Sequence, residues 1–157
     1  GNLTEQTNDT GIFSYGPMNS IDIYPVVLGW PSVSPTGSSD ISPLNGPIII
    51  NNTGNLNRTI EIKAFDLLDE QDQTNSLGSG NFSIDVEGNN ACLSGTRLNN
   101  SNFKPIVGSS SNPGNLSVGD GRGREVFKYC IPTFPTLPPK TYSTKYGGSW
   151  EISISPE

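Results

Sequence analysis

The feature of this sequence that most limits its fold is an alternation of apolar and polar residues with a period of two. Phe82, Ile84 and Val86 alternate with polar residues, and the same pattern recurs over residues 60–64 and 150–154. Side chains on a β-strand point alternately to opposite faces, so the pattern predicts strands with one buried face. Further strands are expected at residues 21–28, 47–51, 103–107, 125–131 and 140–146, each bounded by Gly, Pro, Asn or Ser.

About eight strands without intervening helical patterns predict an all-β chain. The expected fold is an antiparallel β-sandwich of the jelly-roll or Ig-like kind, with residues 21–157 as a single domain and residues 1–20 as an N-terminal arm. Pro25 lacks the N–H that a sheet ladder needs, which places it at a sheet edge or a bulge. Only residues 66–72 resemble a helix start, and a helical turn or an acidic loop is expected there.

Seven Asn-x-Ser/Thr triplets provide the acceptor sequence for N-linked glycans. Random order of this composition would produce about 3 or 4, so the number exceeds chance. Glycan is attached to chains on a secretory route, and the triplets therefore predict an extracellular, cell-surface protein with covalent N-linked glycans. Accidental triplets in a chain rich in Asn, Ser and Thr are the alternative. The acceptors are Asn2, Asn8, Asn51, Asn57, Asn81, Asn99 and Asn115.

The charge of the chain argues against two classes of partner. The net charge is −6, the isoelectric point is about 4.5, and only 15% of the residues are charged. Nucleic acids and anionic membranes recruit clustered Lys and Arg, so neither is expected as a partner. No apolar run approaches the ~18 residues of a transmembrane helix, and Gly1 is expected to be a mature terminus left by signal removal, with no membrane span in the mature chain.

The two cysteines, Cys92 and Cys130, are expected to form one disulfide, because an even count in an extracellular chain favours pairing. A metal or redox pair is the alternative. It has little support, because the spacing is not Cys-x-x-Cys and the chain has no histidine to complete a metal site.

The absence of histidine also removes the commonest general base from the chain, so no enzymatic activity and no cofactor are expected. A carboxylate pair of the kind found in glycoside hydrolases stays open as an alternative.

Two groups of side chains permit a second interpretation. The acidic group Asp66, Asp69, Glu70 and Asp72 is expected to be a solvated loop, with a Ca²⁺ site as the alternative. The aromatic residues Trp30, Trp150, Tyr142 and Tyr146 are expected to pack in the core, with a sugar-stacking face as the alternative.

Residues 47–62 have the sequence PIIINNTGNLNRTIEI, and residues 137–142 have the sequence LPPKTY. The first segment resembles the strand, Asn-Thr-Gly turn and strand of secreted archaeal β-sandwich proteins and of the bacterial camelysin/TasA group of matrix-fibre subunits, and the second adds to the resemblance. The resemblance implies an extracellular filament, similar to TasA-like fibres and archaeal bundling pili. In such a filament each subunit lends a strand to the incomplete sandwich of its neighbour, which produces a head-to-tail homopolymer.

The first apolar group of the chain is the candidate donor strand. Ile12, Phe13, Tyr15 and Met18 follow a polar start at residues 1–11, where a donor strand of the family would already alternate. We expect this group to pack into an adjacent subunit. If it is an ordinary first strand instead, the C-terminal strand at 150–154 becomes the candidate donor. The rival function is a monomeric adhesion or carbohydrate- or protein-binding module that uses loops 32–45 and 108–123.

Overall fold

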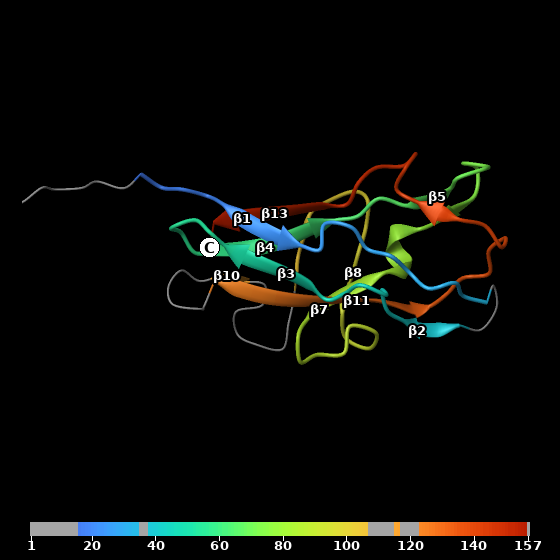
Figure 1. Cartoon of the computed structure of the whole chain (residues 1–157), viewed down its shortest axis with the longest axis horizontal. Helices are drawn as coiled ribbons and strands as arrows, with labels where there is room; N and C mark the ends of the chain where they lie inside the picture. Colours follow the sequence, from blue (N-terminus) through green and yellow to red (C-terminus); the bar gives the residue numbers. More distant parts are fainter. Residues whose placement is uncertain (1–15, 35–37, 107–114, 117–122, 157) are drawn as a thin grey trace, which may run out of the picture.

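The regular secondary structure is almost entirely antiparallel β-sheet in this computed structural model (Figure 1), which describes residues 16–34, 38–106, 115–116 and 123–156. The largest sheet has six strands, in the order β1-β3-β11-β7-β8, and β2 also pairs with β11. Its strands are β1 (Ile21–Tyr24), β2 (Ser39–Ile41), β3 (Ile48–Asn52), β7 (Ser83–Val86), β8 (Thr96–Arg97) and β11 (Arg124–Thr133).

Two smaller sheets complete the architecture. In the four-stranded sheet, the central strand β4 (Arg58–Lys63) pairs with β13 (Glu151–Pro156), β10 (Asn115–Leu116) and β9 (Lys104–Pro105). The three-stranded sheet has the order β12 (Tyr142–Ser143), β5 (Leu67–Asp69) and β6 (Ser76–Leu77). One 3-10 turn, η1 (Ser79–Asn81), leads into β7.

The hydrophobic core lies between the six-stranded and four-stranded sheets. Ile50 of β3, Ile84 of β7 and Phe127 of β11 pack in one cluster with Ile60 and Ile62 of β4. All five side chains are at most 1% exposed. The apolar residues of the alternating pattern therefore face the core, as expected, and the prediction of an all-β antiparallel sandwich is confirmed.

The number of strands is larger than expected. A strand lies in each of the eight predicted segments, but the structure has thirteen strands in its described parts. The five additional strands are β2, β5, β6, β8 and β10, each two or three residues long. Strands of this length are too short to show an alternation. The prediction of a helical turn or an acidic loop at residues 66–72 is wrong in part, because β5 occupies three of these residues.

Pro25 immediately follows β1, which ends at Tyr24. β1 pairs with β3 on one side and is the first strand of its sheet, so the expected edge position is confirmed. The missing N–H of Pro25 leaves no gap in the ladder because the pairing has already ended.

Strand β7 differs from the prediction of a half-buried strand. Ser83 and Asp85, on its polar face, are each 1% exposed, as is Ile84 on its apolar face. The reason is that the chain after β7 folds back over this polar face. The Ser83 hydroxyl donates to the carbonyl of Ala91 at 2.6 Å, and the Asp85 carboxylate accepts from the amide nitrogen of Asn89 at 2.9 Å.

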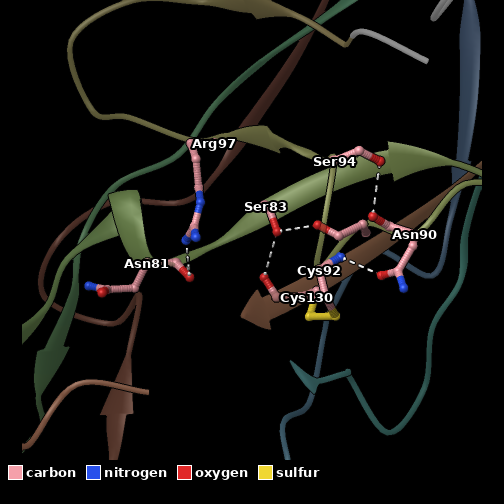
Figure 2. Close-up of a disulfide and its surroundings, with 8 residues drawn as sticks. Asn81, Ser83, Asn90, Cys92, Ser94, Arg97 and Cys130 are labelled. Carbon is pink, nitrogen blue, oxygen red and sulfur yellow. Dashed lines mark hydrogen bonds between the residues drawn. A yellow bond between two sulfur atoms is a disulfide. The ribbon is translucent and has the colours of Figure 1, made fainter. Parts of the chain in front are cut away.

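The Cys92–Cys130 disulfide joins this covering segment to β11, which confirms the predicted pairing. Figure 2 shows the bond below Ser83, whose hydroxyl also approaches the carbonyl of Cys130 at 3.3 Å. Gly95 is required in the same segment, because a Cβ there would lie 2.4 Å from the carbonyl oxygen of Ala91. The covering segment is thus held by a covalent bond and by buried hydrogen bonds together.

Reduction of the disulfide should lower the free energy of unfolding by roughly 4 kcal/mol in the chain-entropy model, because the bond closes a loop of 38 residues. Guanidinium denaturation with and without reductant measures the change. The double variant Cys92→Ser/Cys130→Ser is the control, since its unfolding should not respond to reductant. Two alkylatable thiols in unreduced, denatured protein would contradict the pairing.

Removal of the buried carboxylate should destabilise the fold. The Asp85 carboxylate also accepts hydrogen bonds from the backbone N–H of the adjacent Val86 at 2.8 Å and from the Ser94 hydroxyl at 3.2 Å. Asp85→Ala removes the shared acceptor of the Val86 N–H, the Asn89 amide and the Ser94 hydroxyl from a buried position, so we expect the free energy of unfolding to fall by about 2–3 kcal/mol. The matched control is Glu87→Ala, two residues further along and exposed, which should change it by less than about 0.5 kcal/mol. Equal effects of the two substitutions in urea denaturation would contradict this role of Asp85.

Candidate functional site

One side of the sandwich carries two edge strands with unpaired backbone edges. In the described part of the chain, β1 pairs only with β3, and β13 pairs only with β4. Ile23 of β1 and Ile152 of β13 are half-buried and line the same groove. An unpaired edge presents a row of backbone N–H and C=O groups that can pair with another strand. The groove therefore lies between two edges that are able to accept a strand.

This edge groove has a volume of about 480 Å³. Apolar side chains from β1, β3, β11 and β13 form its walls, and hydroxyl groups of Ser143, Thr144 and Ser149 lie on its border. Its rim includes Val26 and Val27, which are 84% and 70% exposed, and the neighbouring Tyr24 at the end of β1 is 73% exposed. Three large apolar side chains in four residues of one exposed segment are unusual for a solvated loop.

A second groove of about 510 Å³ lies beside the first. The proline-rich segment 134–142 and residues 28–33 form its walls, and we call it the connector groove. The two grooves share four lining residues and therefore adjoin each other. The shared residues are Leu28, Trp30, Leu67 and Tyr142.

Aromatic side chains form the wall and floor of the grooves. The ring centroid of Phe82 lies 5.2 Å from that of Trp30 and 5.0 Å from that of Trp150, both in edge-to-face geometry. Trp150 also contacts Tyr129 at 5.6 Å, and its indole N–H donates to the carbonyl of Phe65 at 2.8 Å. Both tryptophans are partly buried against the core, so their predicted packing role is confirmed.

The two tyrosines of the predicted aromatic group are placed differently. Tyr142 is half-buried and lines both grooves, and its hydroxyl donates to the carbonyl of Pro138 at 3.1 Å. Desolvation, together with the nearby carboxylate of Asp69, raises the pKa of Tyr142 above its ordinary value. Tyr146 is 50% exposed, so it is not a core residue, and the prediction of core packing is wrong for this side chain.

The base of the N-terminal arm is attached to its own domain. The backbone N–H of Met18 donates to the Asn55 side chain at 2.8 Å, and the Asn55 amide donates to the carbonyl of Gly16 at 3.0 Å. Gly54 allows this contact, because a Cβ there would lie 2.3 Å from the carbonyl oxygen of Met18. The Met18 side chain remains 53% exposed. The other arm residues predicted at a subunit interface, Ile12, Phe13 and Tyr15, lie outside the described residues.

The C-terminal strand is not a free donor in this structure. β13 pairs with β4 over its full length, from Glu151 opposite Lys63 to Pro156 opposite Arg58. Trp150 packs against Phe82 in the same sandwich. The alternative in which this strand leaves its own subunit therefore has no support from the geometry.

The glycan acceptors occupy several kinds of position. Asn57 is exposed, and Asn51, Asn81 and Asn99 are half-buried, so none of the acceptor side chains that the structure describes is fully buried. Asn51 lies within β3, opposite Asp22 and Arg124, inside the strand expected at residues 47–51. Asn115 lies in β10, and Asn2 and Asn8 lie outside the described residues.

The acidic residues of the predicted loop have separate partners. Asp66 accepts from the backbone N–H of Ser79 at 2.7 Å, and Asp72 accepts from the Thr74 hydroxyl at 2.7 Å. The hydrogen bonds from Thr74 lower the pKa of Asp72. Asp69 is completely buried, and one of its carboxylate oxygens has no hydrogen-bond partner. Glu70, the fourth member of the group, is half-buried.

No metal site emerges from the described residues. The single group of three metal-binding side chains among them is Asp40, Cys92 and Cys130, and both sulfur atoms are already joined in the disulfide. The four acidic residues of 66–72 do not form such a group. In the parts of the chain that the structure covers, no helix has the length and apolar character to cross a membrane.

Comparison with known proteins identifies no relative: no family model, no curated protein and no solved structure matches this chain. The grooves and the open strand edges thus provide the basis for a functional assignment.

We predict that at least four of the seven acceptors carry glycan, because no described acceptor side chain is fully buried. The mass of protein from its source cells should fall after enzymatic deglycosylation, and Asn57→Gln should remove one glycan. Asn100→Gln is the matched control, since Asn100 is exposed but does not begin an acceptor triplet. Identical masses before and after deglycosylation would exclude the modification.

Proposed function

We propose that this protein is a structural subunit of an extracellular, glycosylated filament, such as a pilus or matrix fibre, that assembles by donor-strand complementation. The observation that carries the proposal is the edge groove, an apolar groove bordered by the unpaired edges of β1 and β13. A strand from another subunit that entered there would gain backbone hydrogen bonds from an edge and would cover apolar side chains with its own.

The positions of the arm and the grooves favour head-to-tail assembly. The base of the arm, coloured blue in Figure 1, joins the domain at one end of the long axis, beside the turn between β3 and β4. β5, which contributes Leu67 to both grooves, lies toward the other end (Figure 1). A contact between unlike ends of a subunit does not close on itself and propagates into a fibre.

The surface chemistry of the chain is consistent with this role. Neutral polar residues and glycan acceptors supply most of its polarity, since charged residues make up only 15%. The proposed role is structural, and it requires no catalysis and no cofactor.

Removal of residues 1–15 should leave a soluble, folded protein that does not assemble, because it deletes the proposed donor and retains the base held by Asn55. Negative-stain imaging and sedimentation measure assembly, and circular dichroism measures folding. The matched control removes only the polar residues 1–11, which leaves Ile12, Phe13 and Tyr15 in place and should preserve the filaments.

Two results would overturn the proposal. Full-length glycosylated protein that remains a monomer at high concentration would exclude a filament subunit. Filaments that form equally well without residues 1–15 would exclude the arm as the donor.

A monomeric cell-surface adhesion module that binds carbohydrate or protein is the second candidate. The connector groove favours it, because a volume of about 510 Å³ falls in the range of ligand pockets and Trp30 lies in its wall. The two candidate functions predict different sizes for the native protein before denaturation. An adhesion module should elute near its glycosylated monomer mass, whereas a filament subunit should elute as a large species.

A further inference from the structure

The edge groove and the connector groove form one continuous apolar surface. They adjoin at Leu28, Trp30, Leu67 and Tyr142, so an occupant that fills one groove can extend directly into the other. The arm contains two aromatic residues close together in the sequence. Phe13 and Tyr15 are separated by one residue, and in an extended strand such side chains lie on the same face, about 7 Å apart.

We infer that Phe13 and Tyr15 of one subunit occupy the two adjoining grooves of the next subunit, one side chain in each. The inference rests on the filament assembly proposed above and adds the binding site of the donor segment. Each groove matches the chemistry of these side chains, because its walls are largely apolar and include aromatic rings. Residues with hydroxyl side chains line both grooves, Ser149 in one and Thr141 in the other, and such side chains suit the hydroxyl of a bound tyrosine.

The chain length places these aromatic residues in a neighbouring subunit. Gly16 is held by Asn55 at the end of the sandwich that carries the β3–β4 turn. Tyr15 is bonded directly to Gly16, and Phe13 is three residues away, a span of at most about 11 Å. β1 begins at this end, and the chain leaves it to reach the grooves only at Ile23–Leu28 and beyond. The grooves of the same subunit therefore lie in the direction away from the fixed base of the arm, and a second copy is the occupant that the geometry favours.

The exposed rim of the edge groove supports the same occupant. Val26 and Val27, which line this groove, are exposed in the single subunit, and a donor segment that lay along β1 into the groove would cover them. This burial adds to the apolar area that the aromatic pair removes from water.

Photo-crosslinking in full-length protein tests where the donor segment binds. The ¹⁵N-labelled protein carries the photoreactive side chain p-benzoylphenylalanine in place of Phe13, and it assembles together with unlabelled wild-type protein. We expect crosslinked peptides that join a heavy arm to a light groove segment, at residues 28–33, 134–142 or 149–152. Heavy–heavy crosslinks alone, obtained from monomers, would show that the arm folds back on its own subunit and would overturn the inference.

A matched pair of substitutions provides the second measurement. Leu137 lines the connector groove and is partly buried, whereas Leu93 is 85% exposed and lines neither groove. Leu137→Glu should abolish assembly, because it places a charge where an aromatic ring would pack, and Leu93→Glu should assemble as the wild type does.

The outcomes separate this inference from the proposed function. Filaments of normal yield from Leu137→Glu, or crosslinks that lie outside both grooves, would overturn the groove assignment and leave the filament intact. Wild-type protein that forms no filament would overturn the proposed function together with the assignment. If Leu137→Glu does not fold, the crosslinks decide the question, since they use an unaltered groove.

Discussion

The structure depends above all on β11, because this strand connects every part of the largest sheet. β11 is ten residues long and pairs with β3, β7 and β2. Three of its inward-facing side chains are buried in succession: Phe127 packs in the core, Tyr129 lines the edge groove, and Ile131 lines the connector groove. One alternating strand therefore builds both the closed centre of the sandwich and its open side.

The opposite face of β11 carries Cys130, which forms the disulfide with Cys92. Cys130 is 1% exposed and joins the segment that covers the polar face of β7. This arrangement explains why Ser83 and Asp85 are buried: the same covering segment that excludes water from them also supplies their hydrogen-bond partners. Such partners offset the free-energy cost of burying polar groups, so the covering segment and the polar face of β7 stabilise each other.

The open side of the molecule contrasts with this closed face. An unpaired strand edge beside an apolar groove promotes association, and isolated proteins usually block such edges with charges, bulges or covering loops. Here the end of β1 at Tyr24 and the following residues Val26 and Val27 are apolar and exposed. In the assembly proposed above, a neighbouring subunit would cover these side chains.

The local features of this protein were predictable from its amino-acid sequence. Alternation, together with the Gly, Pro, Asn and Ser residues that bound each segment, indicated eight strand segments, and the even count of cysteines in a chain without histidine indicated the disulfide, since these signals depend only on neighbouring residues or on composition. The tertiary structure decided the rest. It buried the polar face of β7, paired five short strands that carry no pattern, and brought Leu28, Leu67 and Tyr142 together around two grooves. These features arise from contacts between residues far apart in the chain, which local periodicity does not encode.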